Sequence, residues 1–477
     1  MNPGFKSISQ CATLDQRLQL GFILMFMIPQ GLKQEIRPTL QLAIPLALAE
    51  LAWMTMGIID TIMVGRVSPE AIGGVSIGFT LFHTLSLLGV GLLLGMDTLV
   101  AQAFGAGQTD DCHRTLFHGV YLTLIIGPCL MVCLWICIPV LRSFGIHPDV
   151  LAHAIPYMKV IALCIVPLLL YSAFRCYLQG MNIVKPITFA LVTANLINLA
   201  GNWILIFGNL GAPALGTAGA AWATSISLIY MFLVLLGYAW YHARRDQTGL
   251  LQAHRRLNLT LTRRLLSLGA PAALQIGLES GMFTVVTVLI GKLDPISLAA
   301  HQIVLVCVSF TYMFPLGVGA AAAVRVGQAV GRHDRRGAAQ SGWAALFLGA
   351  VFMLCASAVF LLFPAYIARI YTVDASVIAA AISLLFIAAF FQLFDGVQTI
   401  ATGALRGTGD TRTSMICYLI ICWALGLPFG YFLSFVVGWG ARGLWAGLCV
   451  SLVVLGSILL LIWAKRAVKD TEAPGYS

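Results

Sequence analysis

Charged residues are scarce in this chain of 477 residues: Asp, Glu, Lys and Arg make up 10% of it, whereas 60% is hydrophobic. A water-soluble domain carries about 25% charged residues, so this scarcity excludes an ordinary soluble protein. The apolar residues form twelve runs, each long enough to cross about 30 Å of hydrocarbon. Because backbone polar groups in lipid must hydrogen-bond internally, the runs predict helices, and the expected fold class is an all-α integral membrane protein. The runs start near Thr39, Ser76, Thr115, Ile155, Pro186, Thr217, Leu265, Ser297, Ser341, Ala375, Ser414 and Gly443.

The common sequence motifs of catalysis and nucleotide binding are also missing. The chain has no G-x-x-x-x-G-K-[ST] to hold the phosphates of ATP, no H-E-x-x-H and no C-x-x-C. A G-x-S-x-G occurs at 74–78, but it opens an apolar run, whereas a nucleophile elbow needs a strand that turns into a helix. We therefore expect neither an enzyme nor an ATP-driven pump, and no bound cofactor.

Positive charge is unevenly distributed along the chain, whose formal net charge is +10. With the N-terminus placed in the cytoplasm, 22 Lys and Arg residues fall on the inner side and 6 on the outer side. Such an excess is the positive-inside signal of membrane proteins. The basic balance therefore indicates orientation, with both termini cytoplasmic, and does not predict nucleic acid as a partner.

The twelve cysteines lie mostly within the apolar runs, which argues against a disulfide framework. Cys129, Cys133 and Cys137 are spaced to share one face of a helix. That face could bind a soft metal, but small packing thiols in a membrane helix are the favoured interpretation.

The chain repeats itself at an offset near 226 residues. The segment VGRVSPEAIGGVSI (64–77) aligns with IGKLDPISLAAHQI (290–303), and LGVG at 88–91 recurs at 316–319. Each copy holds six runs, an even number, so both should enter the membrane in the same sense. Two six-helix lobes related by a pseudo-twofold axis along the membrane normal are expected. The predicted divisions are an N-terminal cytoplasmic segment 1–35, an N-lobe 36–241, a basic cytoplasmic linker 242–264, a C-lobe 265–464 and a cytoplasmic tail 465–477.

Two acidic residues of the second copy are predicted to lie deep in the membrane. Glu279 lies 15 residues after Arg264, and Asp395 lies 11 residues before Arg406. At 1.5 Å of rise per residue these separations are about 22 and 16 Å from the inner edge, so the two acids share roughly one depth. Two carboxylates in a low dielectric retain a proton or hold a cation between them, and hard oxygen ligands suit Na⁺ or H⁺.

The first copy offers a different polar group. Asp60 lies nearer the outer face, and Asn198 and Asn202 are one turn apart on a later helix, at a depth from which Asn202 could reach Asp60. Ionisable residues within a membrane are functional by default. Of the others, Asp97 and Glu50 are as easily packing residues as functional ones, and Arg175 is expected near the inner end of its helix.

Several segments together resemble the multidrug and toxic compound extrusion (MATE) family, and its NorM branch in particular. They are IDTIMVG around Asp60, GMDTLVAQAFGAG at 95–107, YMFPLGVGAAAAVRVGQAVG at 312–331 and FQLFDGVQTIATGALRG around Asp395. The resemblance runs from about residue 33 to residue 465.

This resemblance implies a transporter of the bacterial inner membrane that exports cationic amphipathic drugs in exchange for Na⁺ or H⁺, with a monomer expected. It assigns Glu279 and Asp395 to the cation site, where they would also be the ligands of Na⁺. It matches Asp60 to a coupling residue, and it links Asn198 and Asn202 to the N-lobe site. NorM members often carry an aromatic hydroxyl four residues before the Asp395 position, where this chain has Phe391. Glu50 looks like an addition to the pattern, expected to add negative charge to the N-lobe.

A rival interpretation is a flippase for lipid-linked precursors from the same superfamily. Such a protein handles anionic cargo and should line its path with several Arg or Lys residues. Here the strongly intramembrane basic candidate is Arg175, while acids predominate. The exporter is therefore the favoured function.

Overall fold

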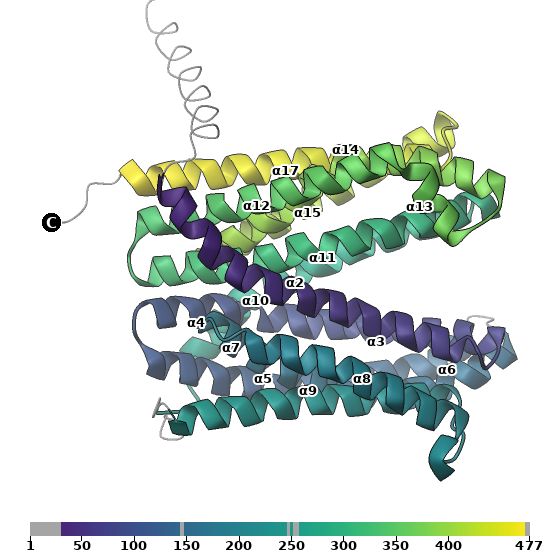
Figure 1. Ribbon diagram of the computed structural model, residues 1–477, viewed down its shortest axis with the longest axis horizontal. Helices are drawn as coiled ribbons and strands as arrows, with labels where there is room; N and C mark the ends of the chain where they lie inside the picture. The colour runs from purple at the N-terminus through teal and green to yellow at the C-terminus, as the bar shows by residue number, and fades with distance from the viewer. Residues whose placement is uncertain (1–29, 144–146, 246–248, 251–256, 473–477) are drawn as a thin grey trace, which may run out of the picture.

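The computed structural model describes residues 30–143, 147–245, 249–250 and 257–472. Within these residues, twelve helices are long and apolar enough to cross a membrane, which confirms the predicted fold class. The long helices run side by side along one direction (Figure 1). We call the end of the bundle where α2 begins and α17 ends the base, at the left of Figure 1, and the opposite end the rim.

The first six spans form one group of helices, drawn in the lower part of Figure 1. Two of these spans are interrupted, so α3 continues into α4, and α6 continues through a 3₁₀ turn (η1) into α7. A further 3₁₀ turn, η2 (Asn209–Gly211), follows the fifth span. The elements are α2 (Gln30–Val64), α3 (Pro69–Leu93), α4 (Gly95–Gly105), α5 (Thr109–Arg142), α6 (Pro148–Ile161), η1 (Ala162–Cys164), α7 (Ile165–Gly180), α8 (Lys185–Phe207) and α9 (Thr217–Arg245).

The last six spans form the second group, which lies above the first in Figure 1. The eleventh span alternates α-helical and π-helical turns, and the short α13 lies at the rim. The elements are α10 (Leu259–Gly291), α11 (Pro295–Gly331), α12 (Arg335–Leu362), α13 (Pro364–Tyr371), α14 (Ala375–Gly407), α15 (Arg412–Tyr418), η3 (Leu419–Gly426), α16 (Leu427–Tyr431), η4 (Phe432–Val436) and α17 (Ala441–Glu472).

The repeat seen in the sequence has a local structural basis at the rim. The spans Pro69–Gly105 and Pro295–Gly331 each contain 37 residues and begin with a proline in the first helical turn. The hydroxyl of Ser68 accepts a hydrogen bond from the amide of Ala71, and the carboxylate of Asp294 accepts one from the amide of Ser297. The bonds from Ser297 lower the pKa of Asp294, which lies outside the spans. An oxygen cap followed by proline fixes where each helix begins.

Two buried apolar clusters correspond to the two groups of helices, but each cluster also contains residues of the other group. Leu42 and Leu46, in the half of α2 nearer the base, pack in the C-lobe cluster, whereas Met56 and Met63 pack in the N-lobe cluster. Leu265, near the start of α10, packs in the N-lobe cluster in return. Figure 1 shows α2 crossing obliquely from one group to the other. The two helices that open the repeats therefore connect the lobes at the base.

Glycines let the lobes touch backbone to backbone in the half of the bundle nearer the base. A Cβ atom on Gly269 of α10 would lie 1.9 Å from the carbonyl oxygen of Leu92 on α3. One on Gly105 of α4 would lie 2.1 Å from the carbonyl oxygen of Gln328 on α11. Because any side chain would overlap these carbonyls, each contact requires glycine.

Hydrogen bonds add to these contacts. The Thr98 hydroxyl donates to the carbonyl of Arg406 at 2.7 Å, and the side-chain amide of Gln102 donates to the carbonyl of Gly407 at 3.0 Å. Within the described ranges, every side-chain hydrogen bond between the lobes lies near the base. One further bond runs from the backbone amide of Asn258 to His118. The others run from Gln328 to the Gly180 carbonyl, from Asn182 to Gln328, and from Arg325 and Ser341 to Glu35.

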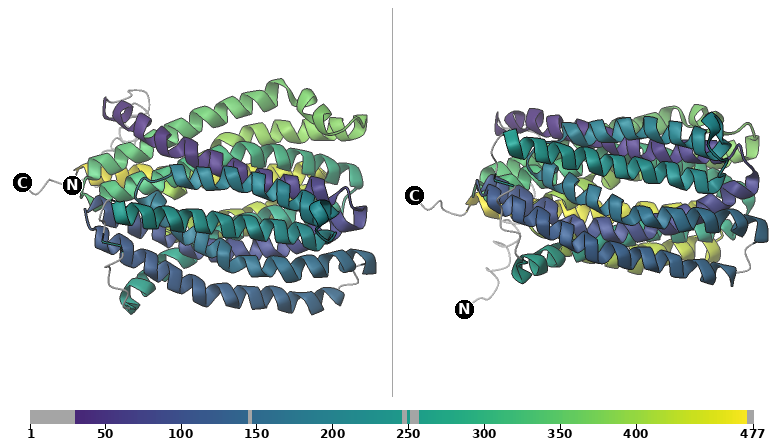
Figure 2. Two further views of the ribbon diagram at one scale, coloured as in Figure 1. Left: turned by 60° about the horizontal axis from the view of Figure 1, so that its bottom comes forward. Right: turned by 90° about the horizontal axis from the view of Figure 1, so that it is seen from below.

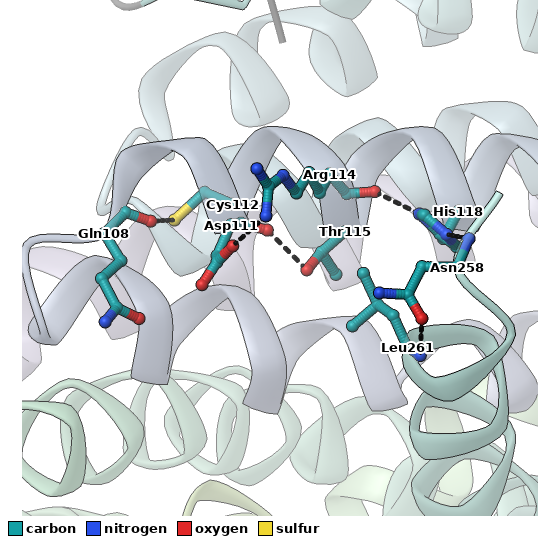
Figure 3. A network of polar contacts seen from close by, with 8 residues as sticks. All are labelled: Gln108, Asp111, Cys112, Arg114, Thr115, His118, Asn258 and Leu261. Atoms are coloured by element: carbon teal, nitrogen blue, oxygen red, sulfur yellow. Dashed lines mark hydrogen bonds and ion pairs between the residues drawn. The ribbon is translucent and has the colours of Figure 1, made fainter. Parts of the chain in front are cut away.

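The histidine completes this closure beside the start of α10 (Figure 3). His118 of α5 accepts a hydrogen bond from the backbone amide of Asn258 through Nε2 at 2.9 Å. Its Nδ1 lies 2.7 Å from the carbonyl of Arg114, which holds the ring in place. Asn258 in turn caps α10 by accepting from the amides of Thr260 and Leu261. The lobes are thus joined at the base, and the conformation is closed at that end.

Two details differ from the expectations. α10 begins at Leu259, so helix occupies part of the range 242–264 that the sequence suggested as a linker. Cys129 and Cys133, which we expected to be small packing thiols in a membrane helix, are exposed on α5, whereas Cys137 is half-buried. The views in Figure 2 show α5, in blue, at the outside of the bundle, which explains the exposure.

Candidate cation site

The structure brings Glu279 of α10 and Asp395 of α14 to one polar cluster in the C-lobe. The side-chain amide of Gln398 joins them, since its Nε2 lies 3.2 Å from Oδ1 of Asp395 and 3.5 Å from Oε1 of Glu279. Gln398 lies three residues after Asp395, so one face of α14 presents both side chains to Glu279. The two predicted acids therefore share one amide donor.

Hydroxyl groups from α11, α14 and α15 lie around the same carboxylates. The phenol of Tyr312 on α11 donates to Oε1 of Glu279 at 2.8 Å, and the Thr399 hydroxyl lies 3.3 Å from that phenol. The phenol of Tyr418, at the end of α15, lies beside Glu279. The cluster is thus made of oxygen-bearing side chains from four helices, α10, α11, α14 and α15.

The cluster has no basic partner among the described residues. Asp395 is only 3% exposed and Glu279 is half-buried, and neither forms an ion pair with a described Lys, Arg or His. An isolated buried carboxylate costs several kcal/mol unless a proton or a cation balances it. The Oε1 atom of Gln398 is buried and accepts no hydrogen bond from the described residues, so it remains available as an oxygen ligand.

The donor set fits a hard monovalent cation or a proton. Carboxylate, phenol, hydroxyl and amide oxygens are the ligands that alkali ions accept, whereas transition metals prefer imidazole and thiolate. No group of three or more His, Cys, Asp or Glu that could hold a metal ion occurs in the part of the chain that the structure describes. A bound Na⁺ would therefore need the neutral oxygens of Tyr312, Thr399 or Gln398 in addition to the two acids.

Sequence reasoning did not find Gln398 and Tyr312. Gln398 lies three residues after Asp395, so helical periodicity could have revealed it. Tyr312 carries no such signal, because only the packing of α11 against α10 brings its phenol to the acid. Phe391, which lacks the hydroxyl expected at its position, is fully buried and stacks on Trp445 at 5.8 Å between ring centroids. The phenols beside the acidic pair come from α11 and α15 instead.

A second polar cluster lies in the N-lobe around Asp60 of α2, which is 6% exposed. The Asn202 amide donates to its Oδ1 at 2.6 Å, and the hydroxyl of Thr224, on α9, donates to its Oδ2 at 2.8 Å. Asn198 accepts from Asn202 at 3.1 Å and supports it. The sequence did not predict Thr224, because its helix contains no acidic residue that would indicate which of its faces turns toward a polar site. Among the described residues, no hydrogen bond links this cluster to the acidic pair of the C-lobe.

The charge of Glu50 is balanced. Its carboxylate forms an ion pair with the guanidinium of Arg175 on α7, so it does not add the net negative charge expected of it. Arg175 lies five residues before the base end of α7, close to a helix end as expected. Asp97 of α4 is 1% exposed and lies 4.0 Å from the guanidinium of Arg406 across the lobe boundary.

We expect the Glu50–Arg175 pair to be structural. Arg175→Leu should lower the free energy of unfolding by about 3 kcal/mol, at the low end for buried pairs, because it leaves a partly buried carboxylate unpaired. The double variant Glu50→Leu with Arg175→Leu should regain most of that loss. Thermal unfolding of the purified protein in detergent measures both. A double variant as unstable as the single one would show that the arginine acts through other contacts.

Comparisons with known proteins agree with this architecture. The MatE family model matches residues 45–204 and 271–432, one segment in each lobe. The chain is 34% identical to the probable multidrug resistance protein NorM of Mesorhizobium japonicum, over 94% of this chain and 97% of that protein. It is 35% identical to the multidrug resistance protein PmpM of Pseudomonas aeruginosa, over 91% of this chain and 92% of that protein.

Solved structures share the fold at lower identity. A multidrug resistance MATE family transporter of the MOP superfamily in an outward-facing conformation has a TM-score of 0.84 at 19% identity, covering 93% of this chain and 99% of that one. A MOP superfamily transporter from Pyrococcus furiosus, described as having a binding pocket of reverse polarity, has a TM-score of 0.83 at 19% identity over the same shares. At such identities the structural similarity establishes the fold alone, and the side chains that line the transport path decide the cargo.

Proposed function

Because this chain belongs to the MatE family of multidrug and toxic compound extrusion transporters and is NorM-like, we propose that it is a secondary active antiporter. It exports cationic amphipathic drugs in exchange for external Na⁺ or H⁺. It needs no ATP and no cofactor beyond the coupling ion, and it works as a monomer in a bacterial inner membrane. The base, with both termini, faces the cytoplasm, and the rim faces outward.

The observation that carries the proposal is the pair Glu279 and Asp395, held by the one amide of Gln398 without a basic partner among the residues described. Such a pair must take up a cation or a proton, and it releases that ion when a positively charged drug replaces it. A permanent ion pair like Glu50–Arg175 could not alternate in this way, since its charge is already balanced.

The contacts at the base support a mechanism of alternating access. The lobes are joined there by backbone contacts and hydrogen bonds, and from this closure we infer an outward-facing state. The coupling ion would reach the acidic pair from the rim. α14 carries Asp395 and also, at its base end, the Arg406 and Gly407 carbonyls that bind Thr98 and Gln102. A change at the ion site is thus connected to the base by one helix, and the lobes would rock about the pseudo-twofold axis.

The Asp60 cluster gives the N-lobe a separate role. The groups that hold its carboxylate, from Asn202 and Thr224, are neutral, and so is the supporting Asn198. They position the side chain of Asp60 while leaving it free to take up a proton. We assign Asp60 to coupling by protonation and the two asparagines to holding its side chain toward the drug path.

The coupling ion can be identified with energised cells that express the wild-type protein. Ethidium efflux is measured with and without Na⁺, and with and without a protonophore. Loss of efflux in the absence of Na⁺ identifies Na⁺, and loss with the protonophore at constant Na⁺ identifies H⁺. Efflux that continues under both conditions would contradict secondary transport by these ions.

The alternative cargo is a lipid-linked precursor with phosphate groups. The two acidic clusters contain carboxylates and neutral donors, and the guanidiniums of Arg175 and Arg406 each face an acid. An absence of drug efflux from the wild-type protein, together with binding of a pyrophosphate-bearing lipid, would replace the exporter by the flippase.

A further inference from the structure

A depression on the surface of the N-lobe is lined by residues that belong to neither acidic cluster. It has a volume of about 420 Å³ and is lined by Trp135, Ile138 and Pro139 of α5 and by Lys159 of α6. Small-molecule sites typically have volumes of about 300–1,000 Å³. Trp135 is 38% exposed and Ile138 is buried, so the floor is apolar and the mouth is open. Because this surface of a membrane-spanning bundle faces lipid, its natural occupant is a lipid.

The position of Lys159 along its span is unusual for a cation. The span Pro148–Gly180 has 33 residues and so a length of about 50 Å, roughly 20 Å more than the hydrocarbon. If the excess is shared equally, Lys159, about 16 Å from the rim end, has its Cα about 6 Å inside the hydrocarbon. The side chain is exposed, and no described acid forms an ion pair with it. A lysine there extends its ammonium toward the headgroups.

Trp135 fixes the geometry of the same place. Its indole Nε1 donates to the backbone carbonyl of Lys159 at 3.4 Å, which ties α5 to α6 and holds the ring beside the lysine. Tryptophan favours the level of the membrane where headgroups meet acyl chains, because its ring is apolar and its N–H is polar. The tryptophan and the lysine therefore indicate the same depth by independent chemistry.

We propose that this depression binds one anionic phospholipid of the leaflet at the rim. The ammonium of Lys159 pairs with the phosphate of the headgroup, and an acyl chain lies over Ile138 and Pro139 against the face of Trp135. Charge complementarity selects this occupant. Lys159 is one of only six Lys and Arg residues of the chain on the rim side, and no described acid pairs with it, so its ammonium is available to an anionic headgroup. The inference rests on the membrane-spanning fold and does not depend on the proposed transport function.

The test uses the full-length protein in lipid nanodiscs of phosphatidylcholine with or without phosphatidylglycerol. Native mass spectrometry counts the lipids that remain bound after release. The Lys159→Met variant keeps the apolar stem and removes the charge, and Lys292→Met, an exposed lysine at the rim end of α10, is the matched control. We expect Lys159→Met to lose about fivefold in the preference for phosphatidylglycerol, whereas Lys292→Met keeps it.

A second readout reports the acyl chain. Phosphatidylglycerol with brominated acyl chains should quench a part of the tryptophan fluorescence that disappears in Trp135→Phe. Excess inorganic phosphate should not displace the lipid, and displacement would make the site one for free phosphate. An unchanged preference in Lys159→Met, or equal binding of phosphatidylcholine, would overturn the proposal.

Discussion

Drug efflux should fall roughly 10- to 100-fold when Asp395 is replaced by asparagine, with expression and folding unchanged. Asparagine is close in shape and keeps an oxygen that can accept from Gln398, whose amide lies 3.2 Å from the native carboxylate. It cannot change its charge, however, so the pair with Glu279 no longer takes up and releases a cation. The magnitude corresponds to the loss of one charged interaction worth about 1.5–3 kcal/mol. The measurement is ethidium efflux from energised cells, normalised to the amount of protein in the membrane.

The same helix supplies a matched control. Asp374 caps α14 at the rim by accepting from the amides of Ser376 and Val377, and it is exposed. Asparagine caps helices as well as aspartate, so Asp374→Asn should leave efflux within about twofold of the wild type. Glu279→Gln should behave like Asp395→Asn. Wild-type efflux in both site variants would remove the C-lobe pair from the coupling mechanism and leave the aspartate of α2 as the candidate.

The Gly269→Ala variant should open the base. Its Cβ would lie 1.9 Å from the Leu92 carbonyl oxygen, so α10 and α3 must separate at that point. Overpacking of this kind costs about 1–3 kcal/mol, which shifts the balance between base-closed and base-open forms by about 5- to 150-fold. Spin labels at Asp110 and Arg335, exposed positions at the base ends of α5 and α12, report the distance between the lobes. A longer-distance population should appear in the variant.

Gly277→Ala provides the control on the same helix. Its Cβ would meet only the Cδ2 atom of Leu88, at 3.6 Å, which is an ordinary contact. Since alanine favours helix over glycine, this variant should keep the distances of the wild type and unfold at the same or a higher temperature. Equal opening in both variants would mean that helix α10 responds to any added methyl group, and the contact at Gly269 would then not be what closes the base.

Much of the candidate site could be predicted because it depends on quantities that run along one helix. Depth follows from the number of residues between an acid and the nearest basic residue, so residue numbers alone were enough to place Glu279 and Asp395 together. The same counting related Asn202 to Asp60, whose side chains lie 2.6 Å apart. Periodicity would also have identified Gln398 from its spacing to Asp395.

The groups contributed by neighbouring helices could not be predicted in this way. The face of α11 that turns toward α10 decides that Tyr312 reaches its acid, and the packing of α9 decides that Thr224 reaches Asp60. Glu50 shows the same limit, because its partner Arg175 lies 125 residues away on another helix. Rotation of one helix against another is set by side-chain packing over the whole interface and leaves no local trace in the sequence.

The sequence by itself determined the number of candidate membrane spans, the division into two related halves and the common level of Glu279 and Asp395, because hydrophobic length, self-similarity and helical rise act locally. Only the tertiary structure decided that α2 and α10 exchange lobes at the base, that glycines bring the backbones into contact there, and that the base is the closed end. Those features depend on how the two lobes pack, and the free energy of that packing is spread over many residues far apart in the chain.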